Sequence, residues 1–206
     1  MKAYTLLILL AVFQVLFCKI EGLTEAKLQE AFTKAQPFIK TFQQQSFPIP
    51  KNTRFNKVSL QVGVLNKNNT KFKIDEHNIL HVSFVHLNAK MTGQFKYNQA
   101  LKSSPFASFT ANLTNMTYTE QYMVNVTKAK TGKSVFKFKK MGQNHLDFKV
   151  KKVEFSNFKE EKKGTKTLAV KAASAGIKNL NYKGFLGHLH KILNLILDTF
   201  AKEAQK

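Results

Sequence analysis

Lysine alternates with apolar residues along several stretches of this sequence, most clearly in Phe136-Lys137-Phe138-Lys139 and Phe148-Lys149-Val150-Lys151. Successive side chains of a β-strand point to opposite faces of the sheet. A strand with this alternation therefore has one apolar face and one cationic face. An apolar face is unfavourable when it is exposed to water. The sequence therefore predicts an antiparallel sheet that packs on one side against other elements.

The strand-like alternation extends from Thr53 to about Val170, and within it the apolar residues change parity three times. The changes fall after Phe84, after Leu113 and after Val150. One extra residue in a strand, a β-bulge, moves all the following side chains to the other face. The changes therefore predict long, strongly twisted and bent strands; the alternative is that each one marks a short loop.

Two short segments have the composition of hairpin turns. They are Lys130-Thr131-Gly132-Lys133 and Gly142-Gln143-Asn144. Turns of this kind join neighbouring antiparallel strands. We therefore expect the sheet to be an antiparallel meander.

Amphipathic helices are predicted at both ends of the chain. The first covers Leu23–Gln45, with Thr24 as its cap and Pro37 expected to kink or divide it, and it ends at the extended segment Ser46–Pro50. The second is indicated by apolar residues at helical spacing, namely Phe185, Leu186, Leu189, Ile192, Leu193, Ile196 and Phe200. The predicted fold class is α+β: a long, strongly bent antiparallel β-meander wrapped around N-terminal and C-terminal amphipathic helices.

Residues 1–22 have the features of a secretory signal peptide. The apolar run Leu6–Phe17 is too short for a transmembrane helix, and cleavage is predicted after Cys18 or Gly22. Cleavage at either position would remove the only cysteine, so no disulfide is expected. We predict a single domain over residues 23–206 and a secreted, extracellular or secretory-vesicle location.

The formal net charge of +21 favours polyanionic partners. Arg54 is the only arginine, and the remaining basic residues are lysines. Lysine is a point charge that suits an anionic membrane surface, whereas base recognition usually uses the arginine fork. We therefore expect a membrane surface and not nucleic acid as partner, although an AT-rich genome would also raise the lysine content.

The sequence does not predict an enzyme, a cofactor or a metal site. Asp75-Glu76-His77 is its densest group of titratable residues, and we interpret it as a solvated turn. His188 and His190 are two positions apart on a predicted helix, so they face different directions and cannot readily share a metal ion.

Four asparagines begin Asn-x-Thr sequons: Asn68, Asn112, Asn115 and Asn125. The last three alternate with apolar residues, so they are expected on the outer face of the sheet. Their common orientation supports N-glycosylation of a secreted protein.

The order of elements resembles the lipid-binding proteins of the bactericidal/permeability-increasing type, within the tubular lipid-binding superfamily. The segment Lys40–Pro50, with its Phe-Pro-Ile-Pro run, is similar to the helix exit of that family. The segments Val58–Val64 and Ile79–Tyr97 are similar to its opening strands. The chain has room for one such domain and resembles the single-domain members.

The resemblance implies a secreted cationic protein that holds acyl chains of an anionic lipid, lipopolysaccharide or phospholipid, between helix and sheet. Antibacterial defence or lipid transport is the implied role. The expected lipid pocket consists of Phe32, Ile39, Phe42, Val62, Phe136, Phe138, Phe148, Leu189, Ile192, Leu193 and Ile196. The expected contacts with anionic headgroups are Lys137, Lys139, Lys149, Lys151 and Lys152.

An alternative function comes from the same patterns. An apolar helix stripe is usually part of a packed core, and patterning alone does not separate a filled core from a lipid-filled one. With a filled core, the protein would be a cationic surface-binding or membrane-disrupting protein without a lipid pocket.

Overall fold

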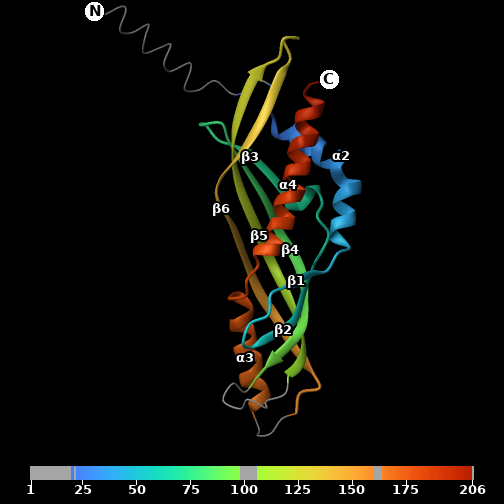
Figure 1. The fold of residues 1–206 in the computed structure, drawn as a ribbon, viewed down its shortest axis with the longest axis vertical. Coiled ribbons are helices and arrows are strands. Elements are labelled where there is room, and N and C mark those ends of the chain that lie inside the picture. The colour runs from blue at the N-terminus through green and yellow to red at the C-terminus, as the bar shows by residue number, and fades with distance from the viewer. Residues whose placement is uncertain (1–19, 21, 98–105, 160–163, 206) are drawn as a thin grey trace, which may run out of the picture.

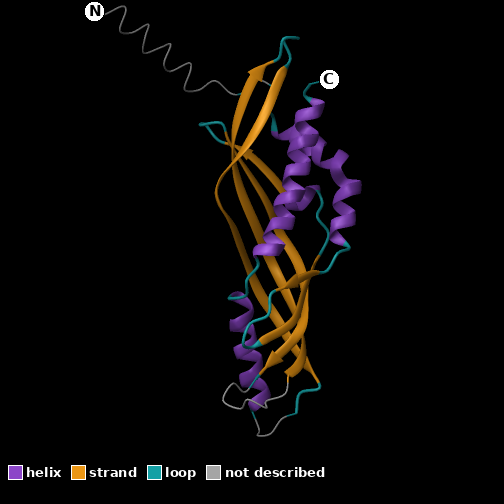
Figure 2. Cartoon of the chain, viewed as in Figure 1, coloured by secondary structure: helices purple, strands orange, loops and turns teal. Residues whose placement is uncertain are grey.

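A long, curved antiparallel sheet forms the body of the structure, and helices cover its apolar face (Figures 1 and 2). The computed structural model describes residues 20, 22–97, 106–159 and 164–205. The predicted signal peptide lies almost entirely outside the described residues. Within them, no helix is long and apolar enough to span a membrane.

The strands follow one another as a meander. Their bounds are β1 Phe47–Ile49, β2 Phe55–Val62, β3 Thr70–Ile74, β4 Ile79–Lys96, β5 Phe106–Lys128 and β6 Ser134–Ser156, with a short 3-10 helix at Lys67–Asn69. The order in the sheet is β1-β2-β4-β5-β6, and β3 pairs with the first half of β4 while β2 pairs with its second half. The predicted α+β fold class with a bent antiparallel meander is confirmed.

Helices from both ends of the chain lie against the sheet: α2 Glu25–Gln43, α3 Thr165–Lys178 and α4 Lys183–Glu203. Helices α2 and α4 lie side by side over one half of the sheet, and α3 lies along β6 at the other end (Figure 1). Strand structure was predicted to continue to about Val170, which is wrong, because β6 ends at Ser156 and α3 begins at Thr165. The apolar residues Ala169, Ala173 and Ile177 recur every fourth position and are buried, which is the helical spacing.

The first helix has the predicted cap. The backbone N–H of Lys27 donates to Thr24 Oγ1 over 3.2 Å. Pro37 does not divide α2, which continues to Gln43. The expected extended connector includes the short edge strand β1, where Pro48 is exposed, as suits a residue that cannot donate to the ladder.

Each of the three parity changes is a β-bulge. His86 adds one residue to β4 and has φ 54°, and Asn115 adds one to β5 and has φ 52°. The third extra residue is Lys151, since Asn112 pairs with Lys152 and Leu113 with Val150. The bulges turn the following half of each strand, so both halves keep their apolar residues on the covered face.

Gly142-Gln143-Asn144 is not the hairpin turn that the sequence predicts. These residues lie inside β6, where Thr119 pairs with His145 and Gln121 with Met141, so the segment is a wide bulge. Gly142 has φ 63°, a conformation that suits glycine. The turn at Lys130–Lys133 is confirmed, because Ala129 N donates to Lys133 O over 2.8 Å.

Candidate functional site

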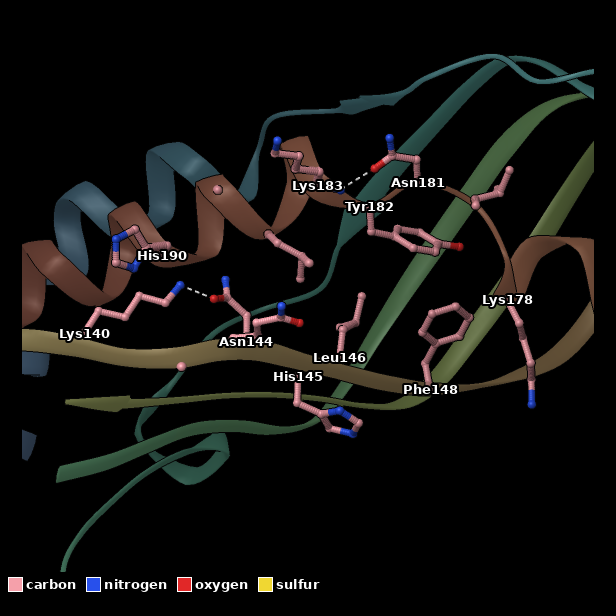
Figure 3. Close-up of a pocket in the computed structure, with 15 residues that line it drawn as sticks. Lys140, Asn144, His145, Leu146, Phe148, Lys178, Asn181, Tyr182, Lys183 and His190 are labelled. Atoms are coloured by element: carbon pink, nitrogen blue, oxygen red, sulfur yellow. Dashed lines mark hydrogen bonds between the residues drawn. The ribbon is translucent and has the colours of Figure 1, made fainter. Parts of the chain in front are cut away.

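An open groove of about 900 Å³ lies between β6 and the beginning of α4 (Figure 3). One wall is the middle of β6, and the other is formed by the end of α3, the α3–α4 connection and the first two turns of α4. The lining residues are Lys140, Gly142, Gln143, Asn144, His145, Leu146, Phe148, Lys178, Leu180, Asn181, Tyr182, Lys183, Leu186, Gly187 and His190. This volume lies within the range of small-ligand sites.

The middle of the groove is apolar. Leu146 and Phe148 come from β6, and Tyr182 faces them from the start of α4 (Figure 3). The rings of Phe148 and Tyr182 are 5.5 Å apart and nearly perpendicular. The Tyr182 hydroxyl donates to Ile177 O over 2.6 Å, so its polar atom is satisfied within the protein. Burial raises the pKa of Tyr182, so the phenol stays neutral.

One end of the groove is polar. Figure 3 shows Lys140, Asn144 and His190 together at this end, away from Phe148 and Tyr182. Behind them lies Glu120, whose side chain is fully buried. Its carboxylate accepts from Lys140 Nζ over 2.8 Å and from His190 Nδ1 over 2.9 Å.

Two tyrosines complete the shell around Glu120. The Tyr118 hydroxyl donates to the carboxylate over 2.5 Å, and the Tyr122 hydroxyl donates to its other oxygen. Asn144 links the shell to the bulge, because it accepts from Lys140 Nζ and donates to Tyr118 Oη over 2.8 Å. We call Glu120, Tyr118, Tyr122, Lys140, Asn144 and His190 the Glu120 cluster.

The Glu120 cluster exists because of strand parity and the β6 bulge. Glu120 shares its parity on β5 with the buried residues Tyr118 and Tyr122, so it points toward α4. Lys140 stands directly opposite Tyr122 on β6. The bulge that starts at Gly142 then brings Asn144 back to Lys140, four residues earlier, from the same strand.

The charge of Glu120 is held in place by its partners. Burial alone raises the pKa of this carboxyl, but the hydrogen bonds from Lys140, from the tyrosine hydroxyls and from His190 outweigh burial. The pKa of Glu120 therefore lies below its ordinary value. Burial and the contact with Glu120 raise the pKa of Tyr118 and of Tyr122, which keeps both as donors.

The groove has a cationic lining. Three lysines and two histidines are among the lining residues, and none of these residues is acidic. Lys178 and Lys183 are exposed near the apolar part, whereas Lys140 has a half-buried side chain at the polar end. His145 points away on the other side of β6 (Figure 3). An apolar floor with a cationic lining suits an amphiphile that carries negative charge.

The structure does not gather the residues of the predicted lipid pocket around one cavity. Phe148 lines the groove, and Val62 lines a separate hollow of about 550 Å³. Phe136 and Phe138 line a third hollow, of about 370 Å³, and both contact the ring of Phe200. The others belong to or pack against the hydrophobic core between α2, α4 and the sheet: Phe32, Ile39, Phe42, Leu189, Ile192, Leu193 and Ile196.

The residues predicted for the outer face are all exposed. This holds for Lys137, Lys139, Lys149, Lys151 and Lys152 on β6. It also holds for Asn112, Asn115 and Asn125 on β5, and Asn68, which lies in the 3-10 helix, is exposed as well. Asn112 pairs with Lys152 and Asn125 pairs with Lys137, so these two sequons share the lysine-rich face of the sheet.

Other titratable groups have local structural roles. Asp75 caps the turn before β4 by accepting from the N–H groups of His77 and Ile79, and it contacts His81 Nε2 over 2.9 Å. His188 and His190 face different directions, as expected, since His188 lies against Phe47. In the part of the chain that the structure describes, no group of His, Cys, Asp and Glu could hold a metal ion.

The Glu120 cluster was missed in the sequence, although one signal pointed to it. Glu120 stands in a row whose other members, Met116, Tyr118, Tyr122 and Val124, are apolar or aromatic. A carboxylate in such a row must be buried and therefore needs donors. Lys140 and His190 could not be assigned as those donors, because their pairing depends on the β6 bulge and on how α4 lies across the sheet.

Comparisons with known proteins give little to set beside this geometry. No protein-family model matches the chain, and no curated protein matches it in sequence. Among solved structures, the crystal structure of Epiphyas postvittana Takeout 1 is similar over 87% of this chain and 92% of that chain. The identity is 14% and the TM-score is 0.44, so neither ligand nor role is transferred from it.

Proposed function

We propose that this protein is a secreted, cationic lipid-binding protein of the tubular lipid-binding type. Its groove between β6 and α4 holds an acyl chain of an anionic lipid, and antibacterial defence or lipid transport is its role. The proposed lipid site is therefore this groove and not the helix-covered core, where the sequence predicted it. In the groove, Phe148 is joined by Leu146, Leu180, Tyr182 and Leu186.

The observation that carries this proposal is the groove itself. It combines an open volume of about 900 Å³ with an apolar floor and with a lining that has no acidic residue. Each methylene group buried there contributes about 0.8 kcal/mol to binding. The exposed lysines of β6 supply attraction to an anionic membrane, at about 1 kcal/mol for each residue near the surface.

The groove volume favours a lipid with few chains. About 900 Å³ suits a ligand of ordinary small-molecule size. A multi-chain lipopolysaccharide would have to leave most of its chains outside. A phospholipid or a single-chain amphiphile fits the proposal better.

A second candidate function is supported by the packing of the core. The residues of α4 that face the sheet, including Leu189, Leu193 and Ile196, are almost completely buried. With the groove unused, the protein would be a cationic surface-binding or membrane-disrupting protein that acts through its lysines alone. Its binding would then be lost in high salt and would not depend on acyl-chain length.

The two functions are separated by filling the groove. Gly187 lines the groove, and a Cβ atom added to it meets no other atom within 4 Å. Gly184 lies one turn earlier on α4 with equally open surroundings, but it does not line the groove. Gly187→Leu therefore narrows the groove, and Gly184→Leu is the matched control.

The measurement is binding of a fluorescent fatty-acid probe at high salt, together with mass spectrometry of lipid that co-purifies with the secreted protein. We expect Gly187→Leu to weaken probe binding at least tenfold and Gly184→Leu to leave it unchanged. Equal binding by both variants, or no co-purifying lipid and no uptake by delipidated protein, would reject the groove as a lipid site.

A further inference from the structure

The Glu120 cluster has balanced charges at the polar end of the groove. Glu120 carries one negative charge and Lys140 one positive charge, and their atoms are 2.8 Å apart. While His190 is neutral, the cluster therefore has no net charge. Both Lys140 and His190 are about 30% exposed and line the groove, whereas Glu120 is fully buried. A molecule in the groove can contact the two basic groups but not the carboxylate.

The ammonium group of Lys140 has one N–H donor that is available to a ligand in the groove. An ammonium group has three N–H donors. Two are directed to Glu120 and Asn144, which fix the side chain at this end. Among the described residues, the third has no hydrogen-bond acceptor that would compete with a ligand. An oxygen atom of a ligand head group can therefore accept from Lys140 Nζ without displacing Glu120.

The hydrogen bonds of His190 determine where it can take up a proton. An ionised carboxylate only accepts, so His190 Nδ1 carries the hydrogen directed to Glu120. The other nitrogen, Nε2, lies 3.1 Å from the amide group of Asn194. A half-turn of that amide exchanges its N–H donor for its oxygen acceptor. His190 Nε2 can therefore be protonated without losing its partner.

We propose that the polar end is the head-group subsite of the groove: it binds an anionic carboxylate or phosphate head through Lys140 and takes up one proton from solvent at His190 Nε2. The proposal rests on the function proposed above. An anionic head beside the neutral cluster would leave two negative charges and one positive charge in a half-buried site. Protonation of His190 restores the balance, so binding and proton uptake are linked.

The groups that face His190 come from three elements. Tyr122 and Glu120 lie on β5, Lys140 lies on β6, and Asn194 lies one turn further along α4. The tyrosines stay neutral, and Glu120 and Lys140 are charged partners of each other. Of the side-chain types that contact the polar end, histidine is the one that ordinarily gains or loses a proton near neutral pH.

The test compares an anionic amphiphile with a neutral one of equal chain length. Myristate and myristyl alcohol are titrated into the full secreted chain at several pH values, and proton uptake is measured in buffers of different ionisation enthalpy. His190→Gln keeps a donor for Glu120 but cannot be protonated. His188→Gln is the matched control, because His188 is on the same helix, faces Phe47 and does not line the groove.

For the wild type and for His188→Gln, we expect uptake of up to one proton with myristate and none with the alcohol. Affinity for myristate then rises by up to about tenfold for each unit by which pH falls. His190→Gln should bind both compounds without this dependence. A titration with myristoyl lysophosphatidate compares a phosphate head group with the carboxylate of myristate. The compound that binds more tightly identifies the head group that the subsite favours.

The outcomes separate the two proposals. If neither compound binds the wild type, the proposed lipid-binding function fails. If both bind but myristate binding takes up no proton, or if His190→Gln retains the pH dependence, the head-group subsite is overturned while the lipid-binding function stands.

Discussion

Among the residues that the structure describes, Glu120 is the one charged residue with a fully buried side chain. Its four donors differ in kind: two neutral hydroxyls, one imidazole and one ammonium group. Hydrogen bonds to a charged group contribute about 1.5 to 3 kcal/mol each before the cost of burial. The cluster therefore fixes the orientation of α4 against β5 and β6 at the polar end of the groove.

Replacement of the carboxylate tests this role. We expect Glu120→Gln to lower the free energy of unfolding by about 2 to 3 kcal/mol, because Lys140 loses its charged partner at a half-buried position. Chemical denaturation measures the change. The matched control is Glu154→Gln on β6, whose pair with Lys152 is exposed and should contribute less than about 1 kcal/mol. Equal effects of the two changes would contradict the structural role of Glu120.

The dependence of stability on acid pH should also reflect the ionisation of Glu120. The pKa of Glu120 is lowered from its ordinary value of 4.5 in the folded state. A lowered carboxyl pKa means that the folded state is stabilised above the ordinary value, and that this stabilisation is lost as pH falls through the folded-state pKa. We expect the unfolding free energy of the wild type to decrease below pH 4.5 more steeply than that of Glu120→Gln. Parallel curves from the two proteins would contradict this expectation.

At the scale of the elements, helix α3 is held by a close contact between backbone and ring. A Cβ atom added to Gly176 would lie 2.7 Å from Phe55 Cε2. The Phe55 ring has little freedom to move, because it packs against the rings of Phe95 at 4.9 Å and Phe109 at 5.7 Å. Gly176 thus allows α3 to approach the sheet.

The same substitution on two helices should therefore have opposite effects. We expect Gly176→Ala to lower the unfolding free energy by about 1 to 3 kcal/mol through overpacking against Phe55. Gly187→Ala on α4 meets open space and should raise it by about 0.5 to 1 kcal/mol, because alanine favours the helix. Thermal unfolding of both variants measures the difference. A gain in stability from Gly176→Ala would show that α3 is not held by this contact.

The sequence predicted most elements because their signals are local. Parity predicted irregularities after Phe84, Leu113 and Val150, and strand pairing shows them to be bulges; helical spacing located α2 and α4. Gly142-Gln143-Asn144 was misinterpreted because a glycine with positive φ serves equally in a turn and in a bulge. Only the pairing of the flanking residues across β5 distinguishes the two. The groove could not be predicted for the same reason, since it depends on how distant elements approach one another.

At the scale of the whole molecule, the covered face and the lysine-rich outer face of the sheet are separate surfaces. The groove opens between β6 and α4, while the lysine rows follow the outer side of the same strand. Substitutions can therefore test the proposed membrane attraction and the proposed acyl-chain binding independently.

Five substitutions to glutamine test the outer surface. We expect replacement of Lys137, Lys139, Lys149, Lys151 and Lys152 to weaken binding to anionic phospholipid vesicles by at least a hundredfold at low salt, since each lysine contributes about 1 kcal/mol near such a surface. Fatty-acid binding in the groove should be unchanged. The charge-matched control replaces exposed helix lysines instead: Lys27, Lys40, Lys171, Lys191 and Lys202. Equal losses in both variants would show that net charge alone matters.

The pairing of β5 with β6 places two sequons directly beside two of these lysines. Asn112 is the cross-strand partner of Lys152, and Asn125 is the partner of Lys137. A glycan on either asparagine would occupy the space that a bilayer needs in order to reach the lysine. Under the proposed function, a glycosylated molecule would be kept away from membranes, whereas a molecule without these glycans would be able to bind them. Glycan occupancy would thus divide the protein into two populations with different destinations.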